Sequence, residues 1–188
     1  LCLRAAGRAL WAMGRPGEAR DYLERAVAVT TGALGNVRQD IAQDDGVSAL
    51  VFLGYTLAAL GRPRKAISTV EAGIGRAVAL RQGTSIGLAF LGAAWTAMIL
   101  HDFEGAAAYA RPGLEHCDRH GSNNYTAWAR FTLGWTQCLR GDPVAGLAEM
   151  RAAAAASQAT GTMVFRTIML CFIGERQLAV RDLDGARV

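Results

Sequence analysis

The sequence predicts an all-α fold, a right-handed α-α superhelix of about four and a half helical hairpins that repeat every 40 residues. Three observations lead to this prediction. The 188-residue chain is 52% hydrophobic, which is enough to bury a core. It contains 22 glycines but only 4 prolines, and its abundant Ala, Leu and Arg favour helices separated by glycine turns. Short breaks in the helical pattern also recur at a nearly constant spacing.

Five such breaks mark the ends of the predicted inner helices, and their first residues are 47, 40, 40 and 40 positions apart. Proline at the third break position suits the first turn of the next helix, because its missing N–H is not needed there. The breaks are Gly14-Arg15-Pro16, Gly61-Arg62-Pro63, His101-Asp102-Phe103, Gly141-Asp142-Pro143 and Arg181-Asp182-Leu183.

Helices are therefore expected on both sides of each break. Inner helices are predicted near 1–13, 46–60, 84–100, 123–140 and 163–180, and outer helices near 17–31, 64–81, 103–119 and 143–160. They pair into hairpins over 1–31, 46–81, 84–120 and 123–160, with a last hairpin, 163–188, cut short at its end. We expect one continuous repeat domain over 1–188, taken from a longer protein because both ends fall inside predicted helices.

The first interval is seven residues longer than the others. The extra residues fall between Thr31 and Asp45, where Gly32 and Gly35 break the first outer helix. A short additional turn is expected over 36–43.

Two columns of small residues explain how the hairpins close. One stands seven residues before each break and the other five residues after its start, so the two are twelve residues apart. Antiparallel helices joined by a short turn approach closely only where side chains are small. Glycine inside a helix costs about 0.5–1 kcal/mol relative to alanine, so four glycines in one column indicate a packing requirement. The columns are Gly7, Gly54, Ala94, Gly134 and Gly174, and Ala19, Ala66, Ala106, Gly146 and Ala186.

This pattern resembles the tetratricopeptide repeat, which has a small residue in its first helix and an alanine twelve residues later. The resemblance covers nearly the whole chain and implies hairpins stacked into a superhelix. The spacing of 40 exceeds the usual 34 of that family, which implies longer helices. The proline that usually closes the second helix is replaced by Thr31, Val78, Asp118 and Gln158.

A closer resemblance begins at Gln43-Asp44-Asp45-Gly46-Val47-Ser48-Ala49-Leu50 and continues through 84–95 and 128–141. These segments look like the repeat region at the C-terminal end of bacterial class III adenylate or guanylate cyclase–ATPase fusion proteins, related in plan to maltose-activator-like regulators. The resemblance implies a regulatory module of a bacterial multidomain signalling protein.

The charge pattern and the cysteines limit the kinds of partner and the cellular compartment that are expected. The net charge is +4, and both signs interleave along the chain, so a nucleic-acid partner is not expected. The four cysteines lack CxxC spacing and are predicted to be small buried hydrophobes in a reduced compartment, the cytoplasm. The uncharged stretch Gly83–Leu100 contains Ser85, Thr96 and three glycines, so it is interpreted as an inner helix rather than a membrane span.

One column of the repeat is aromatic. The position directly after the small residue of each inner helix holds Arg8, Tyr55, Trp95, Trp135 and Glu175. In tetratricopeptide stacks this column and residues three or four positions away line the concave face, which would add Val51 and Cys138. The predicted partner-binding residues combine the aromatic members of this position with their neighbours on the same helix face. We call this set the aromatic column, although it includes Leu91 and Met98: Trp11, Tyr55, Leu91, Trp95, Met98, Trp128, Phe131 and Trp135.

Two interpretations of the aromatic column stay open. Large rigid side chains favour a groove that binds a peptide segment or small ligand, since they bury much area at little entropic cost. The alternative is a tightly curled repeat whose inside these side chains fill. Arg4 and Arg8, one turn apart, are a candidate contact for an anionic group of a ligand.

No cofactor, metal site or catalytic centre is expected. His116 and His120 have a spacing that suits zinc, but no third ligand accompanies them, and a helix C-terminus also favours histidine. The sequence contains no phosphate-binding glycine loop, nucleophile elbow or zinc-protease motif. The predicted function is binding of a protein or peptide partner, or of attached domains of the same chain. The alternative is a structural spacer or self-association module.

Overall fold

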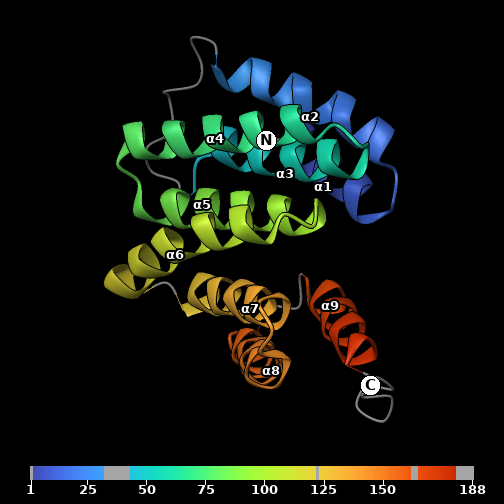
Figure 1. The fold of residues 1–188 in the computed structure, drawn as a ribbon. Helices are drawn as coiled ribbons and strands as arrows, with labels where there is room; N and C mark the ends of the chain where they lie inside the picture. Colours follow the sequence, from blue (N-terminus) through green and yellow to red (C-terminus); the bar gives the residue numbers. More distant parts are fainter. Residues whose placement is uncertain (1, 32–42, 122, 162–164, 181–188) are drawn as a thin grey trace. The chain divides into compact units, whose positions relative to one another are not determined.

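The computed structural model describes residues 2–31, 43–121, 123–161 and 165–180, and within these ranges every regular element is an α-helix (Figure 1). The helices are α1 (Cys2–Ala12), α2 (Pro16–Thr31), α3 (Asp45–Ala59), α4 (Pro63–Leu80), α5 (Gly83–Ile99), α6 (Phe103–His120), α7 (Asn123–Leu139), α8 (Pro143–Ala159) and α9 (Arg166–Ala179).

The predicted helix ends agree with these bounds to within one residue, except that α9 begins at Arg166 rather than near 163. The glycine-and-proline breaks are strong local signals, which is why the ends next to them are predictable. Most of the expected extra turn over 36–43, and the start of the last outer helix, lie outside the described residues.

The chain divides into two compact units, residues 1–102 and 103–188. In the first, α1 pairs with α2 and α3 with α4, while α5 packs on both α3 and α4. In the second, α7 pairs with α8 and also contacts α6, and α9 packs mainly on α8. The division falls inside the predicted hairpin 84–120, and a single continuous domain stays a prediction.

Each described break has the same backbone geometry. Its first residue adopts a left-handed conformation, at Gly14, Gly61, His101 and Gly141 with φ of 72, 69, 56 and 102°. The N–H of the next residue donates to the carbonyl five residues earlier, as Arg62 does to Leu57 over 2.9 Å. This is the Schellman ending of a helix, and it explains why glycine usually opens the break.

A second left-handed column ends the outer helices and is not anticipated by the sequence analysis. Arg81, Gly121 and Gly161 follow α4, α6 and α8 with φ of 51, 68 and 77°, and they too are 40 residues apart. The missing proline of the tetratricopeptide pattern is therefore compensated by a left-handed residue three positions later.

The small-residue columns meet at the helix crossings as predicted. A Cβ atom added to Gly134 would lie 2.9 Å from the carbonyl oxygen of Gly146 and 3.0 Å from the backbone nitrogen of Met150. One added to Gly54 would lie 2.3 Å from a methyl carbon of Val70, and one added to Gly7 would lie 2.6 Å from Leu23. Only hydrogen fits at these positions.

A polar junction at the start of α3 ties three helices together. The Asp44 carboxylate caps α3 by accepting the Val47 N–H over 2.8 Å, and it accepts two hydrogen bonds from Arg76 of α4, over 2.6 and 3.1 Å. The Asp44 N–H donates to the Ser85 hydroxyl of α5 over 2.9 Å. Burial alone would raise the pKa of Asp44, but the Arg76 and backbone hydrogen bonds outweigh it and lower that pKa below its ordinary value.

The crossing geometry predicts opposite effects for two alanine substitutions. Gly134→Ala should lower the free energy of unfolding by about 1–3 kcal/mol, because its methyl group would meet backbone atoms that cannot move aside. Gly75→Ala, with no described atom within 4 Å, should raise it by about 0.5–1 kcal/mol through helix propensity. Urea unfolding at neutral pH measures both; equal effects would contradict the packing explanation.

The Asp44 junction predicts a pH dependence. Because its pKa is lower in the folded chain, its contribution is full above the ordinary value of 3.8 and is lost as the pH falls through the folded value. Asp44→Asn keeps a cap but loses the charge, so it should cost roughly 1 kcal/mol at pH 7. The difference between wild type and variant should shrink in urea unfolding near pH 2.5. A constant difference would show that the charge is not responsible.

Candidate functional site

The N-terminal part of the aromatic column forms a cluster between α1 and α3. The Trp11 ring lies 5.8 Å from Phe52 and 5.5 Å from Tyr55, and the Arg8 guanidinium lies 5.4 Å above the Phe52 ring. Tyr55 is only 1% exposed, whereas Trp11 is half-buried. The two inner helices are therefore joined by edge-on and tilted ring contacts.

The members of the aromatic column on α5 lie in the interior. Leu91 and Met98 have no exposed surface and Trp95 is 2% exposed. Both α5 and α3 are buried around most of their circumference, and every residue from 46 to 58 is buried. These inner helices are therefore part of the core, and they do not present one apolar face to an open groove.

On α7 the column is also packed. Trp128 is 5% exposed, donates its indole N–H to the Ser157 hydroxyl of α8 over 3.3 Å, and meets the Phe165 ring edge-on at 4.6 Å. Phe131 and Trp135 are fully buried, and the Trp135 ring lies 6.0 Å from Phe172 of α9.

This burial is what the packed-interior alternative expects. Of the eight residues, only Trp11 is more than slightly exposed, so a partner would reach the others only if the inner helices separated. The partner-binding role of the aromatic column stays a prediction.

The two arginines proposed as an anion contact lie against groups of their own chain. Arg4 forms a 2.9 Å ion pair with Asp45, and a second nitrogen lies 3.5 Å from the Ser48 hydroxyl. Arg8 covers Phe52 as described above. An anionic ligand would have to displace Asp45 from Arg4, and this contact also stays a prediction.

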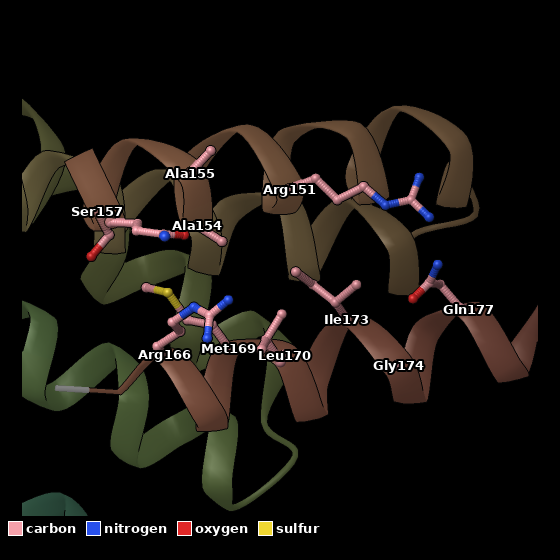
Figure 2. Close-up of a pocket in the computed structure, with 11 residues that line it drawn as sticks. Arg151, Ala154, Ala155, Ser157, Arg166, Met169, Leu170, Ile173, Gly174 and Gln177 are labelled. Atoms are coloured by element: carbon pink, nitrogen blue, oxygen red, sulfur yellow. The ribbon is translucent and has the colours of Figure 1, made fainter. Parts of the chain in front are cut away.

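A groove that the sequence analysis does not anticipate lies between α8 and α9 (Figure 2). Its volume is about 270 Å³. The lining residues are Arg151, Ala154, Ala155, Ser157 and Gln158 of α8 with Arg166, Met169, Leu170, Ile173, Gly174 and Gln177 of α9.

The lining of the groove is mainly apolar, with Ser157, Gln158 and Gln177 as its uncharged polar members and an arginine toward each end. Figure 2 shows Leu170 and Ile173 pointing from α9 toward α8, with Arg166 at one end and Arg151 near the other. Gly174, a member of the crossing column, lines the groove, and its predicted crossing partner Ala186 lies outside the described residues.

The cysteines and histidines give no sign of catalytic or metal chemistry within the described residues. Burial raises the pKa of the Cys117 thiol to about 11, with a smaller contribution from Asp118, so little thiolate exists at neutral pH. His120 stacks on His116, with ring centroids 4.2 Å apart, and its Nδ1 lies 2.8 Å from the His116 carbonyl oxygen. No group of three candidate metal ligands occurs there.

One expectation about the cysteines is wrong. Cys117 is buried and Cys138 is half-buried, but Cys2 and Cys171 are exposed on the surfaces of α1 and α9. Helical periodicity places these two on the outer side of their helices, where small apolar residues are tolerated. In the described part of the chain, no helix is long and apolar enough to span a membrane.

Comparison with known proteins identifies the fold. No protein-family model and no curated protein matches the chain. Among solved structures, a Rap protein in complex with competence and sporulation factor is similar, with a TM-score of 0.70 at 14% identity. The match covers 98% of this chain but 59% of the Rap chain.

Two crystal structures of a Podosopora anserina protein, described as a kinesin light chain with nearly identical TPR-like repeats, are also similar. Their TM-scores are 0.62 and 0.61 at 13% identity, covering 99% of this chain and 88% and 89% of theirs. The fold is tetratricopeptide-like. The predicted all-α class and the general resemblance are thereby confirmed.

The interior position of the aromatic column predicts how it responds to truncation. Trp135→Ala should lower the free energy of unfolding by about 3–5 kcal/mol, as expected for a fully buried indole. A groove-lining tryptophan open to solvent would cost far less. Chemical unfolding of the variant, compared with Leu178→Ala at an exposed site of α9, measures the difference. A loss below about 1 kcal/mol would contradict the packed interior.

Proposed function

We propose that this chain is a non-catalytic interaction module that binds a polypeptide segment in the groove between α8 and α9. The observation that carries the proposal is the combination of an apolar lining, Leu170 and Ile173 among it, with an arginine toward each end. Apolar area supplies affinity, and the arginines supply orientation through charge-assisted hydrogen bonds.

The position of the groove favours a polypeptide, because it runs between two helices and can receive a row of side chains from a docked segment. The similar Rap structure, which is in complex with competence and sporulation factor, supports a partner-binding role for this fold.

The resemblance to cyclase–ATPase fusion proteins suggests the setting. We propose a cytoplasmic, bacterial multidomain signalling protein in which partner binding by this module regulates attached domains. The aromatic column, if its helices separate, would offer a second surface to the partner. Sequencing the gene on both sides of the segment tests the setting, since a cyclase or ATPase domain must adjoin it.

A structural spacer or self-association module is the second candidate. The observation in its favour is the burial of the aromatic column, because Tyr55, Trp95 and Trp135 then act in stability and not in recognition.

Peptide selection tests the proposed site. We expect a phage-displayed library of 16-residue peptides to yield binders whose affinity falls at least tenfold in Leu170→Glu, which places a charge among the apolar lining residues. Fluorescence anisotropy measures the affinity, and circular dichroism confirms that the variant stays helical.

Leu178→Glu is the matched control. It makes the same change on α9 at a side chain that is 57% exposed and does not line the groove, so binding should be unchanged. Binders that lose affinity equally in both variants, or in neither, would refute the α8–α9 site. A library without any binder would favour the spacer.

A further inference from the structure

In the first unit, neighbouring inner helices pack through one face of each. A Cβ added to Gly92 of α5 would lie 2.5 Å from a methyl carbon of Val51 of α3 and 3.1 Å from its Cβ. The two backbones are therefore close, and the residues around this contact are buried on both helices. They are Val47, Val51 and Ala58 on α3, with Ala89, Gly92 and Thr96 on α5.

The first and last described inner helices carry the same two faces, and there both are exposed. The repeat places α1 at the position of α5, because their breaks at Gly14 and His101 are 87 residues apart. It places α9 at the position of α3, because their breaks at Arg181 and Gly61 are 120 residues apart. The residues equivalent to the buried ones are all exposed and uncharged. We call Cys2, Ala5 and Ala9 the α1 face, and Thr167, Cys171 and Leu178 the α9 face.

The two faces match in size. Where α3 meets α5, a valine lies against a glycine. The equivalent pair is Cys171 on the α9 face and Ala5 on the α1 face. Cysteine has one side-chain atom fewer than valine and alanine has one more than glycine, so the pair fills nearly the same space. Helix contacts tolerate such volume-conserving exchanges best.

The charges beside the two faces are opposite. The residue directly after the small residue of each inner helix is aromatic in α3, α5 and α7, but it is Arg8 in α1 and Glu175 in α9. Glu175 pairs with the adjacent Arg176 and its side chain is 43% exposed, while Arg8 lies over Phe52. An α1 helix packed on α9 in the way that α5 packs on α3 places Arg8 and Glu175 on neighbouring helices, one repeat apart.

From the match in size and charge we propose that a second copy of this chain binds head to tail, with its α1 face packed on the α9 face. Cys171 then lies against Ala5 of the second copy, and Glu175 faces Arg8 of the second copy. The contact joins two different surfaces, so each copy retains a partner surface at its other end. This inference is independent of the proposed groove, because no residue of the two faces lines it.

A charge-swap experiment tests the pairing of the two ends. Sedimentation equilibrium of the reduced wild-type chain should give an average mass that rises with concentration. Arg8→Glu and Glu175→Arg should each weaken association roughly five- to tenfold, because each replaces an attracting pair with a repelling one. An equimolar mixture of the two variants should associate again, since their altered charges attract each other. Circular dichroism confirms that both variants stay helical.

The matched controls are Arg111→Glu and Glu115→Arg, which make the same charge changes at exposed positions of α6. Each control should associate alone as the wild type does. A wild-type chain that stays monomeric would overturn the proposal. So would a mixture of the Arg8 and Glu175 variants that associates no better than either variant alone, or controls that lose association to the same extent.

A disulfide tests the register of the contact. In the Cys2→Ser background, Ala5→Cys should link to Cys171 of a second copy on air oxidation, since the equivalent β-carbons of the α3–α5 contact are 3.1 Å apart. Ala12→Cys is exposed on the same helix but lies about 10 Å further along it, so it should stay unlinked. Non-reducing electrophoresis measures both. Equal linking of the two variants, or linking of neither, would refute the proposed register and with it the contact.

Discussion

The close approach of the two helices in the hairpins α1–α2, α3–α4 and α7–α8 is the constraint on which the structure depends. At Gly134 a single added carbon would meet a carbonyl oxygen and a backbone nitrogen, so the crossing has no space for a side chain. That contact fixes the depth at which each outer helix lies on its inner helix. It also fixes the register, because the residues of the outer helix that meet the glycine stand twelve to sixteen positions on. A larger side chain there would force the two helices apart.

Tight hairpins also determine where a partner can bind. Inner helices that lie close to several neighbours are buried on most sides, as α3 and α5 are, and their largest side chains become the core. The same cause makes Tyr55, Trp95 and Trp135 conspicuous in the sequence and inaccessible to a partner in the folded structure. These large side chains fill the space that the longer helices enclose. The groove between α8 and α9, by contrast, lies at the surface of its unit, which is why it is the site proposed for a partner.

The parts of the fold that local chemistry determines were predictable from the sequence. Helix ends depend on a left-handed glycine and a following proline, and those residues are visible at Gly14, Gly61 and Gly141. Arg81 and His101 adopt the same backbone conformation without the glycine that would announce it, so their role is apparent only in the structure. The junction of Asp44 with Arg76 joins residues 32 positions apart, and no periodicity predicts which arginine reaches that carboxylate. The exposure of side chains on inner helices was the least predictable feature, because it depends on how many neighbours each helix has.

The repeat contains two kinds of position, those in the small-residue columns and those beside them. The difference between them suggests how such a chain acquires specificity. Column positions, such as Gly54 and Gly134, must stay small, since they set how closely the two helices of their hairpins approach. Positions beside the columns carry no such requirement, and there the chain differs from repeat to repeat: Glu24 in one hairpin corresponds to Arg151 in another. The same backbone shape can therefore carry opposite charges in different hairpins. Glu24 is used in this way within the chain, since it pairs with Lys65 of the next hairpin over 3.2 Å.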